Sequence, residues 1–228
     1  MIQLIVFGTG GNSVEIVETV RAINACSPDG ARYTVLGFLD DNRTLWGRTR
    51  HGLPVLGGIP RAQDLAGQFV NGIGGPDSFW RREQIVARAC VPPERFETLV
   101  HPAATVASTA RLKPGVVVFP HAAIGSYAQV DNHVLVLPNA VVSHDVAVGA
   151  HTCIASGVCI SSGVKIGVSC YLGTGSSLIG SIRVGDRSLI GMGSVVLHDV
   201  PGESVVVGSP AKFLRPLHAR APASAAGR

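Results

Sequence analysis

The pair His144-Asp145, in the segment VVSHDVAVGAH (141–151), has the residue types that proton transfer requires. A carboxylate next to an imidazole can orient the ring and raise its basicity, so the pair predicts a general base. A histidine at a regular position of a fold is also commonly structural. The residues alone leave both interpretations open.

A glycine-rich turn, Gly8-Thr9-Gly10-Gly11-Asn12-Ser13, follows an apolar segment and precedes apolar residues at helical spacing. Bare amides at a helix N-terminus suit phosphate, because they approach the anion closely and the helix dipole favours it. Ser13 occupies the third glycine position of the dinucleotide fingerprint, so that match fails. The turn predicts a nucleotide or sugar-nucleotide site, with a structural tight turn as the alternative.

The acidic pair Asp40-Asp41 follows the next predicted strand. Carboxylates at the end of a second parallel strand commonly take ribose hydroxyls or the polar edge of a base. We therefore assign this pair to the same predicted site as the glycine-rich turn.

Neither a metal centre nor a cysteine nucleophile is indicated. The histidines lack the spacing of a metal-ligand set, and the five cysteines form no CxxC pair and belong to no evident triad. We expect no metal cofactor. Unclustered thiols in odd number, and a start without a basic signal-peptide region, predict a reducing, cytoplasmic compartment.

The elements that must position these residues follow from a repeat. An aliphatic residue recurs at every sixth position from Val106 to Val196. Period six fits a coil in which each hexad supplies one short strand and one corner, and three hexads close a triangular turn. The aliphatic residue points inward, and glycine directly after it is expected to accept the unusual dihedral angles of the corner. The repeat predicts a hexapeptide-repeat parallel β-helix, which is left-handed in the families that carry it.

This repeat also places the histidines relative to one another. His133 and His151 are one coil apart, so they are expected to stack in one column. His144 and His198 share another column but are three coils apart, which is too far to cooperate.

The first hundred residues alternate strand and helix patterns. Strands are predicted at 2–7, 33–39, 68–73 and 96–100, helices at 14–25, 60–66 and 76–89, and a loop up to Gly58. This alternation predicts an α/β Rossmann-like domain. We expect domain boundaries of 1–101 for this unit and 102–215 for the β-helix, followed by a disordered Ala/Pro-rich tail over 216–228.

Composition excludes several classes of protein. The 228 residues carry a net charge of +4, with 15% charged and 46% hydrophobic residues. That hydrophobic content is too high for a disordered chain, yet no apolar run is long enough for a membrane span. No basic stripe is interleaved with aromatic residues, so we expect no nucleic-acid partner.

Up to about Pro216 the chain resembles the hexapeptide-repeat sugar acyltransferases of the sialic-acid O-acetyltransferase and bacillosamine N-acetyltransferase type. The matching blocks are IVFGTGGNS at the start, GFLDDNRTLWGRTRHGLPVLGG (37–58), GIGG (72–75), VVSHDVAVGAH (141–151), SSGVKIG (161–167) and VVVGSPAKFL (205–214). The resemblance implies a homotrimer that binds acetyl-CoA, without a metal, in the groove between neighbouring β-helices.

The resemblance also implies roles for individual positions. His144 would be the general base and Asp145 its partner. A UDP- or GDP-linked amino sugar would contact Gly10, Gly11, Asn12, Asp40, Asp41 and Gly74. Acetyl-CoA would contact Cys153, Ser162, Gly163, Thr174, Gly208 and Lys212. At Cys153, relatives have a second histidine that can contact the acetyl group.

The expected function is therefore acetyl-CoA-dependent N-acetylation of a nucleotide-linked sugar of the 4-amino-4,6-dideoxy type. Sugar O-acetylation of the sialic-acid type is the nearest alternative, because an amine and a hydroxyl need the same base. A non-catalytic β-helix that binds a ligand or partner is an alternative from a different class.

Overall fold

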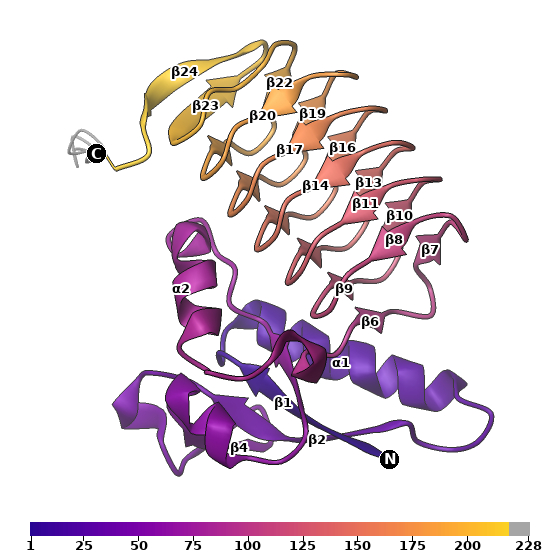
Figure 1. Ribbon diagram of the computed structural model, residues 1–228, viewed down its shortest axis with the longest axis vertical. Coiled ribbons are helices and arrows are strands. Elements are labelled where there is room, and N and C mark those ends of the chain that lie inside the picture. Colours follow the sequence, from indigo (N-terminus) through magenta and orange to yellow (C-terminus); the bar gives the residue numbers. More distant parts are fainter. Residues whose placement is uncertain (219–228) are drawn as a thin grey trace, which may run out of the picture.

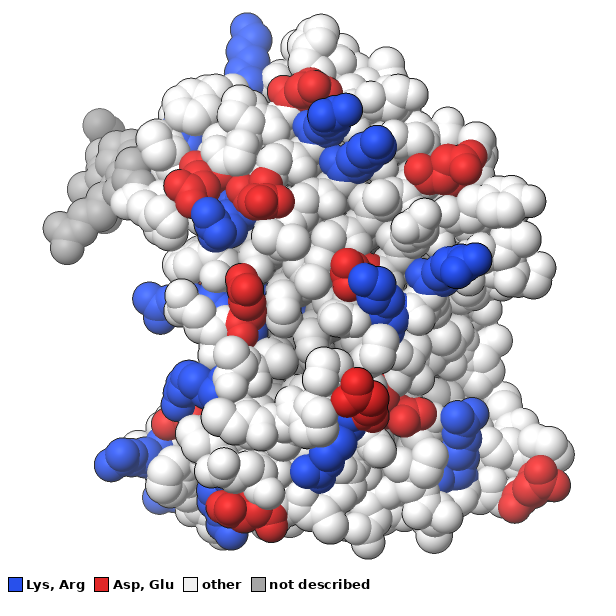
Figure 2. Space-filling view, viewed as in Figure 1, with Lys and Arg blue, Asp and Glu red and all other residues white. Residues whose placement is uncertain are grey.

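The computed structural model describes residues 1–218, in which an N-terminal α/β unit is followed by stacked coils of short strands (Figure 1). The coils rise away from the N-terminal unit, from β6 and β7 beside it to β22 at the far end. Within residues 1–218, no helix has both the length and the apolar character needed to cross a bilayer. Charged side chains of both signs are scattered over the face drawn in Figure 2 and form no single patch there.

The coils build three parallel sheets, named here in the order in which the chain enters them. The first sheet contains β6 (Leu99–Val100), β9 (Val117–Val118), β12 (Leu135–Val136), β15 (Cys153–Ile154), β18 (Tyr171–Leu172), β21 (Leu189–Ile190), β23 (Ser204–Gly208) and β24 (Ala211–Pro216). The second contains β7 (Thr105–Val106), β10 (Ala123–Ile124), β13 (Val141–Val142), β16 (Cys159–Ile160), β19 (Ser177–Leu178) and β22 (Val195–Val196). The third contains β8 (Arg111–Leu112), β11 (Gln129–Val130), β14 (Ala147–Val148), β17 (Lys165–Ile166) and β20 (Arg183–Val184).

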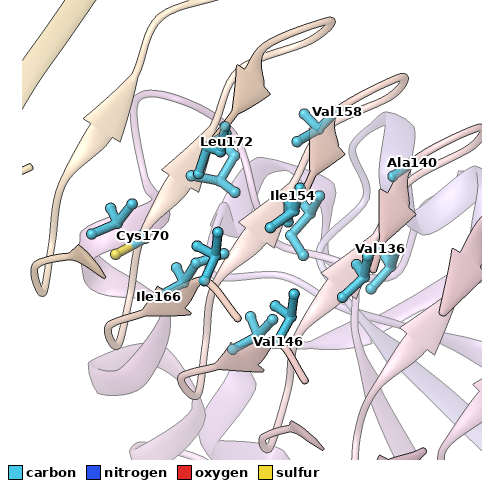
Figure 3. Packing of buried hydrophobic residues seen from close by; sticks show 14 of the residues in the cluster. Val136, Ala140, Val146, Ile154, Val158, Ile166, Cys170 and Leu172 are labelled. Atoms are coloured by element: carbon cyan, nitrogen blue, oxygen red, sulfur yellow. The ribbon is translucent and has the colours of Figure 1, made fainter. Parts of the chain in front are cut away.

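From β6 to β22 the strands of each sheet pair in parallel at a spacing of eighteen residues, as three hexads per coil require. β21 pairs with β23 at a spacing of sixteen residues, and β24 is antiparallel to β23. The recurring aliphatic residues point into the coil, where Val136, Ile154, Ile166 and Leu172 pack together (Figure 3). The predicted parallel β-helix is confirmed, and its coils fit the left-handed form expected from the repeat.

The expected role of the glycines that follow the aliphatic residue is wrong. Positive φ angles lie two positions later, at residues such as His133, Asp145 and His151. Gly149 and Gly173 instead lack room for a side chain, because a Cβ at Gly149 would lie 2.5 Å from the carbonyl carbon of Gly167 in the next coil. These glycines allow close stacking of the coils rather than an unusual backbone angle.

The N-terminal unit is a five-stranded sheet of order β3-β4-β2-β1-β5. Its elements are β1 (Ile2–Phe7), α1 (Gly11–Cys26), β2 (Tyr33–Leu39), β3 (Thr49–Arg50), β4 (Leu53–Gly57), β5 (Gln68–Asn71) and α2 (Arg82–Ala87), with 3-10 turns at Arg43–Leu45, Ile59–Asp64, Phe79–Arg81 and Pro93–Arg95. β1 lies parallel to both β2 and β5, whereas β3 and β4 form an antiparallel hairpin. The sheet is therefore mixed.

Four expectations for this part of the chain differ from the structure. The loop up to Gly58 contains the hairpin of β3 and β4, and the helix predicted at 60–66 is a 3-10 turn. The α-helix predicted at 76–89 spans only Arg82–Ala87. β6 already pairs with β9, so the β-helix begins before the expected boundary at residue 102.

The predicted disordered tail begins too early. Pro216 ends β24, and the buried Leu217 donates its N–H to the carbonyl of Glu203 at 2.7 Å. The remainder of that prediction, from residue 219 onward, lies outside the described residues.

The N-terminal unit packs on the outer face of the first sheet. Ile16 and Val20 of α1 share one buried apolar cluster with Val117, Leu135 and Cys153, whose side chains project outward from β9, β12 and β15. The carboxyl ends of β1, β2 and β5 consequently lie beside the β-helix.

Candidate functional site

A cleft of about 590 Å³ lies where the carboxyl ends of β1, β2 and β5 meet the β-helix. Leu137 and Tyr171 close it from the β-helix side, and the loop at 72–76 forms one wall. All six positions predicted to hold the sugar nucleotide line this single cleft: Gly10, Gly11, Asn12, Asp40, Asp41 and Gly74.

The N-terminus of α1 opens into the cleft. Gly10 caps the helix without a side-chain hydrogen bond, and no acidic residue occupies the first turn. Nothing lies within 4 Å of where a Cβ of Gly10 or Gly11 would be. These open amides at the positive end of a sixteen-residue helix form a surface suited to an anion.

The structure shows how Ser13 is accommodated at the position where the dinucleotide fingerprint has its third glycine. The Ser13 side chain is buried, and its hydroxyl donates to the carbonyl of Phe7 at 3.2 Å. α1 can approach the sheet closely because Gly72, which faces Ser13, has no side chain; a Cβ on Gly72 would overlap Ser13.

The carboxylates of Asp40 and Asp41 hold the loops that frame the cleft. Asp40 accepts hydrogen bonds from the backbone N–H and the hydroxyl of Thr9, at 3.0 and 2.8 Å. Asp41 accepts from the N–H of Ile59 at 3.1 Å and pairs with Arg88 at 2.7 Å. Both residues therefore have a structural role, alongside any lone pairs that they offer to a ligand.

The carbonyl of Gly74 ties the wall of the cleft to both units. It accepts from Asn12 Nδ2 at 3.1 Å and from Cys153 Sγ at 3.5 Å. Cys153 is fully buried, and burial raises its pKa to about 11. The predicted contact between Cys153 and acetyl-CoA does not fit this burial, because the N-terminal unit covers the thiol.

His144 and Asp145 lie at an exposed corner between β13 and β14. Nδ1 of His144 is 2.7 Å from Oδ2 of Asp145, and the two side chains are 62% and 61% exposed. If Nδ1–H donates to the carboxylate, Nε2 is left as the proton acceptor. Asp145 has a φ of 57°, a left-handed angle that aspartate tolerates better than most residues.

The structure does not bring His144 into the cleft of its own chain. The cleft borders the first sheet and its corner with the second sheet, represented by Leu137. His144 occupies the corner between the second and third sheets. In a triangular coil, that is the corner that does not touch the first sheet.

The positions predicted to contact acetyl-CoA also lie on different corners of the β-helix. Ser162 and Gly163 lie one coil above His144, and the Gly163 N–H donates to the His144 carbonyl at 3.2 Å. Thr174 follows β18, at the corner between the first and second sheets. Gly208 and Lys212 lie in the hairpin of β23 and β24. One chain therefore presents these residues on separate corners.

Several solved structures share this architecture. A perosamine N-acetyltransferase from Caulobacter crescentus, in complex with CoA and GDP-perosamine, superposes with a TM-score of 0.80 at 24% identity, over 93% of this chain and 97% of that one. The acetyltransferase domain of PglB from Neisseria gonorrhoeae, in complex with acetyl coenzyme A, gives 0.78 at 27% identity, over 93% and 98%. WeeI from Acinetobacter baumannii gives 0.60 at 19% identity, over 94% and 100%. No family model and no curated protein matches the chain.

The chain has the fold of the hexapeptide-repeat sugar acetyltransferases. The resemblance predicted from the sequence motifs is thereby confirmed. Within residues 1–218, no group of three or more His, Cys, Asp or Glu side chains is arranged to hold a metal ion.

Large exposed apolar residues of the β-helix lie on the second sheet with its two corners, and on β24, where Phe213 and Leu214 are exposed. The second sheet presents small, uncharged residues outward, namely Thr105, Ala123, Val141, Cys159, Ser177 and Val195. Large exposed apolar side chains on this sheet and its two corners are Tyr127, Val141, Ile179, Met192 and Leu197. By contrast, the third sheet presents Arg111, Lys165 and Arg183.

Sequence reasoning missed the cleft residues that belong to the β-helix, Leu137 and Tyr171. The sequence does contain a pattern that includes Tyr171, a series of apolar residues that recur every eighteen positions. The position before each inward aliphatic residue of the first sheet is apolar at Val117, Leu135, Cys153, Tyr171 and Leu189. Outward apolar residues at every third hexad indicate a face that another part of the protein covers.

Proposed function

We propose that the protein is an acetyl-CoA-dependent N-acetyltransferase that acts on the amino group of a nucleotide-linked amino sugar of the 4-amino-4,6-dideoxy type. One observation carries the proposal: every residue predicted to hold the sugar nucleotide lines the same cleft. The N-terminal unit would then serve as a Rossmann-like nucleotide-binding domain, and the β-helix, from β6 onward, as the transferase domain.

The comparisons support this assignment. The Caulobacter enzyme holds CoA and GDP-perosamine, an amino sugar nucleotide, and the Neisseria domain holds acetyl coenzyme A. The open N-terminus of α1 suits the diphosphate of such a substrate. The five free cysteines fit the cytoplasmic location proposed from the sequence.

In the proposed mechanism, His144 Nε2 takes a proton from the acceptor amine as the amine attacks the thioester carbonyl. Asp145 holds the ring through Nδ1 and stabilises the imidazolium that forms. Backbone amides of the β-helix would stabilise the tetrahedral oxyanion. When the intermediate collapses, the C–S bond breaks, an amide forms, and the CoA thiolate takes up the proton.

A homotrimer would complete the site. In a closed ring of three copies whose second sheets face the axis, the corner between the second and third sheets of one copy meets the corner between the first and second sheets of the next. His144 would then face the neighbour's cleft, and Ser162 and Gly163 would face the neighbour's Thr174. The uncharged second sheet, with its exposed apolar corners, fits this placement.

The decisive experiment is a thiol-release assay with acetyl-CoA and a panel of acceptors. We expect turnover with a UDP- or GDP-linked 4-amino-4,6-dideoxy sugar. Comparing the rates with the two substrates identifies the nucleotide that the natural substrate carries. Activity only on a free hydroxylated sugar would establish O-acetylation instead. No turnover with any acceptor would favour the non-catalytic, ligand-binding alternative.

A further inference from the structure

Arg82, the first residue of α2, is a buried cation without a counter-ion. It is fully buried and is the only Lys, Arg, Asp or Glu with a buried side chain among residues 1–218. Its Nη2 donates to the backbone carbonyl of His133, whereas Nε and Nη1 have no hydrogen-bond partner in the described part of the chain. No carboxylate pairs with it in residues 1–218.

The groups around Arg82 do not neutralise it. His133 and His151 stack with ring centroids 4.9 Å apart, and burial lowers their pKa values to about 3 and about 4, so both rings are uncharged near neutral pH. Burial likewise keeps Cys153 as a thiol. Arg82 itself remains protonated, since burial lowers its pKa only to about 10.

Arg82 lies directly behind the wall of the cleft. A Cβ on Gly74 would overlap Arg82 Nη1 and would lie 2.9 Å from Cδ1 of Leu135. Gly74 therefore separates the guanidinium from the cleft by a single backbone layer without a side chain. The N-terminus of α1, which contacts the same wall through Asn12, contributes a second positive end to the cleft.

We infer that Arg82 is a positioning residue for the diphosphate of the substrate, acting through the field that it projects across the 72–76 wall. The inference rests on the proposed function, because it assigns the diphosphate to this cleft. A buried charge without a counter-ion costs stability, and an anion bound on the cleft side of Gly74 would offset part of that cost.

The test compares Arg82→Met, Arg82→Lys and the matched control Arg81→Met. Arg81 is the exposed preceding residue, and its guanidinium lies over the Trp80 ring. Titration calorimetry would give the Kd of GDP, UDP and CoA, and NMR titration would give that of guanosine and uridine. Melting temperatures report on folding.

We expect Arg82→Met to raise the Kd of the bound nucleoside diphosphate about tenfold, which corresponds to about 1.4 kcal/mol. Affinities for the nucleoside and for CoA should stay within about twofold, and the loss should persist at high salt, because a buried charge is weakly screened. The melting temperature should be unchanged or higher, because an apolar chain replaces an unpaired charge. Arg82→Lys and Arg81→Met should bind like the wild type.

Different results overturn different statements. A wild-type protein that binds neither GDP nor UDP would refute the proposed function together with this inference. Wild-type binding with unaltered affinity in Arg82→Met would overturn the role of Arg82 alone. Equal losses for nucleoside and diphosphate, or a loss in Arg82→Lys as large as in Arg82→Met, would show that Arg82 supports the fold rather than the diphosphate.

Discussion

At the scale of single residues, the contact between His144 and Asp145 defines the expected chemistry. The 2.7 Å contact uses Nδ1, and when Nδ1–H donates to the carboxylate, Nε2 is the proton acceptor. A second His-Asp sequence, His198-Asp199, occupies the same corner column, but the Asp199 carboxylate accepts the backbone N–H of Arg183 at 2.8 Å. The two pairs occupy the same position of the repeat, but the carboxylate of Asp145 contacts the imidazole of His144, whereas that of Asp199 accepts a backbone N–H.

His144→Ala should lower kcat at least about a hundredfold, which is the usual scale for a lost general base. Thiol release measures the rate, and light scattering checks that the assembly is intact. His198→Ala is the matched control and should retain wild-type activity. An active His144→Ala variant would assign proton transfer to another group.

Asp145→Asn tests the orienting carboxylate without disturbing the corner, because asparagine also tolerates a φ of 57°. Loss of the negative charge should lower kcat roughly tenfold and leave KM for acetyl-CoA nearly unchanged. An equal rise in KM would indicate that Asp145 contributes to binding instead.

At the scale of elements, the coils stack tightly and carry a column of histidines, in which His133 is buried and His151 is half-buried. His133 and His151 lie against Arg82, and desolvation by burial is the largest cause of their lowered pKa values. In the unfolded chain these rings titrate near their ordinary value of 6.5. The folded state therefore binds fewer protons than the unfolded state between about pH 6.5 and pH 4, and its stability falls as the pH is lowered through that window.

His151→Asn should reduce this acid sensitivity. The melting temperature, followed by circular dichroism, should drop less between pH 7.5 and 4.5 in the variant than in the wild type. His121→Asn is the control, because His121 occupies an equivalent corner with a φ of 61° but is exposed. Equal pH dependence in all three proteins would exclude His151 as a source of the acid sensitivity.

Gly149→Ala tests the stacking distance between coils. The added Cβ would lie 2.5 Å from the Gly167 carbonyl carbon, so the coils must separate locally, at a cost of about 1–3 kcal/mol in unfolding free energy. Gly157→Asn is the contrasting variant: Gly157 has a φ of 67° and no neighbour closer than 4.0 Å, so asparagine should be tolerated. Urea denaturation compares the two.

At the scale of the whole molecule, the cleft and His144 lie on different corners of the β-helix, so the proposed site needs two copies of the chain. Val141, 39% exposed on the uncharged second sheet, would lie near the contact. Val141→Lys should dissociate the proposed trimer and abolish activity, as measured by light scattering and thiol release. Gln129→Lys, at the equivalent outward position of the third sheet, should do neither.

Subunit complementation tests the shared site directly. A cleft variant such as Gly11→Arg and the variant His144→Ala should each be inactive alone. In trimers reassembled from equal amounts, about a quarter of the sites would combine an intact cleft with an intact His144 from the neighbour, so about a quarter of wild-type activity should return. No recovery would place both parts of each site in one chain.

The sequence by itself determined the β-helix, because a period of six fixes which residue of each hexad points inward. The inward residues contact one another in a pattern that repeats from coil to coil, so the period alone is enough to specify the core. It also identified as candidates His144, Asp145 and six residues of the N-terminal unit that line the cleft. Only the tertiary structure decided that Cys153 is buried against the loop at Gly74, that Arg82 lies without a counter-ion behind Gly74, and that His144 lies on a corner away from the cleft. These features depend on how the N-terminal unit docks on the first sheet. Contacts between segments far apart in the chain produce no periodic pattern in the sequence, so they could not be predicted from it.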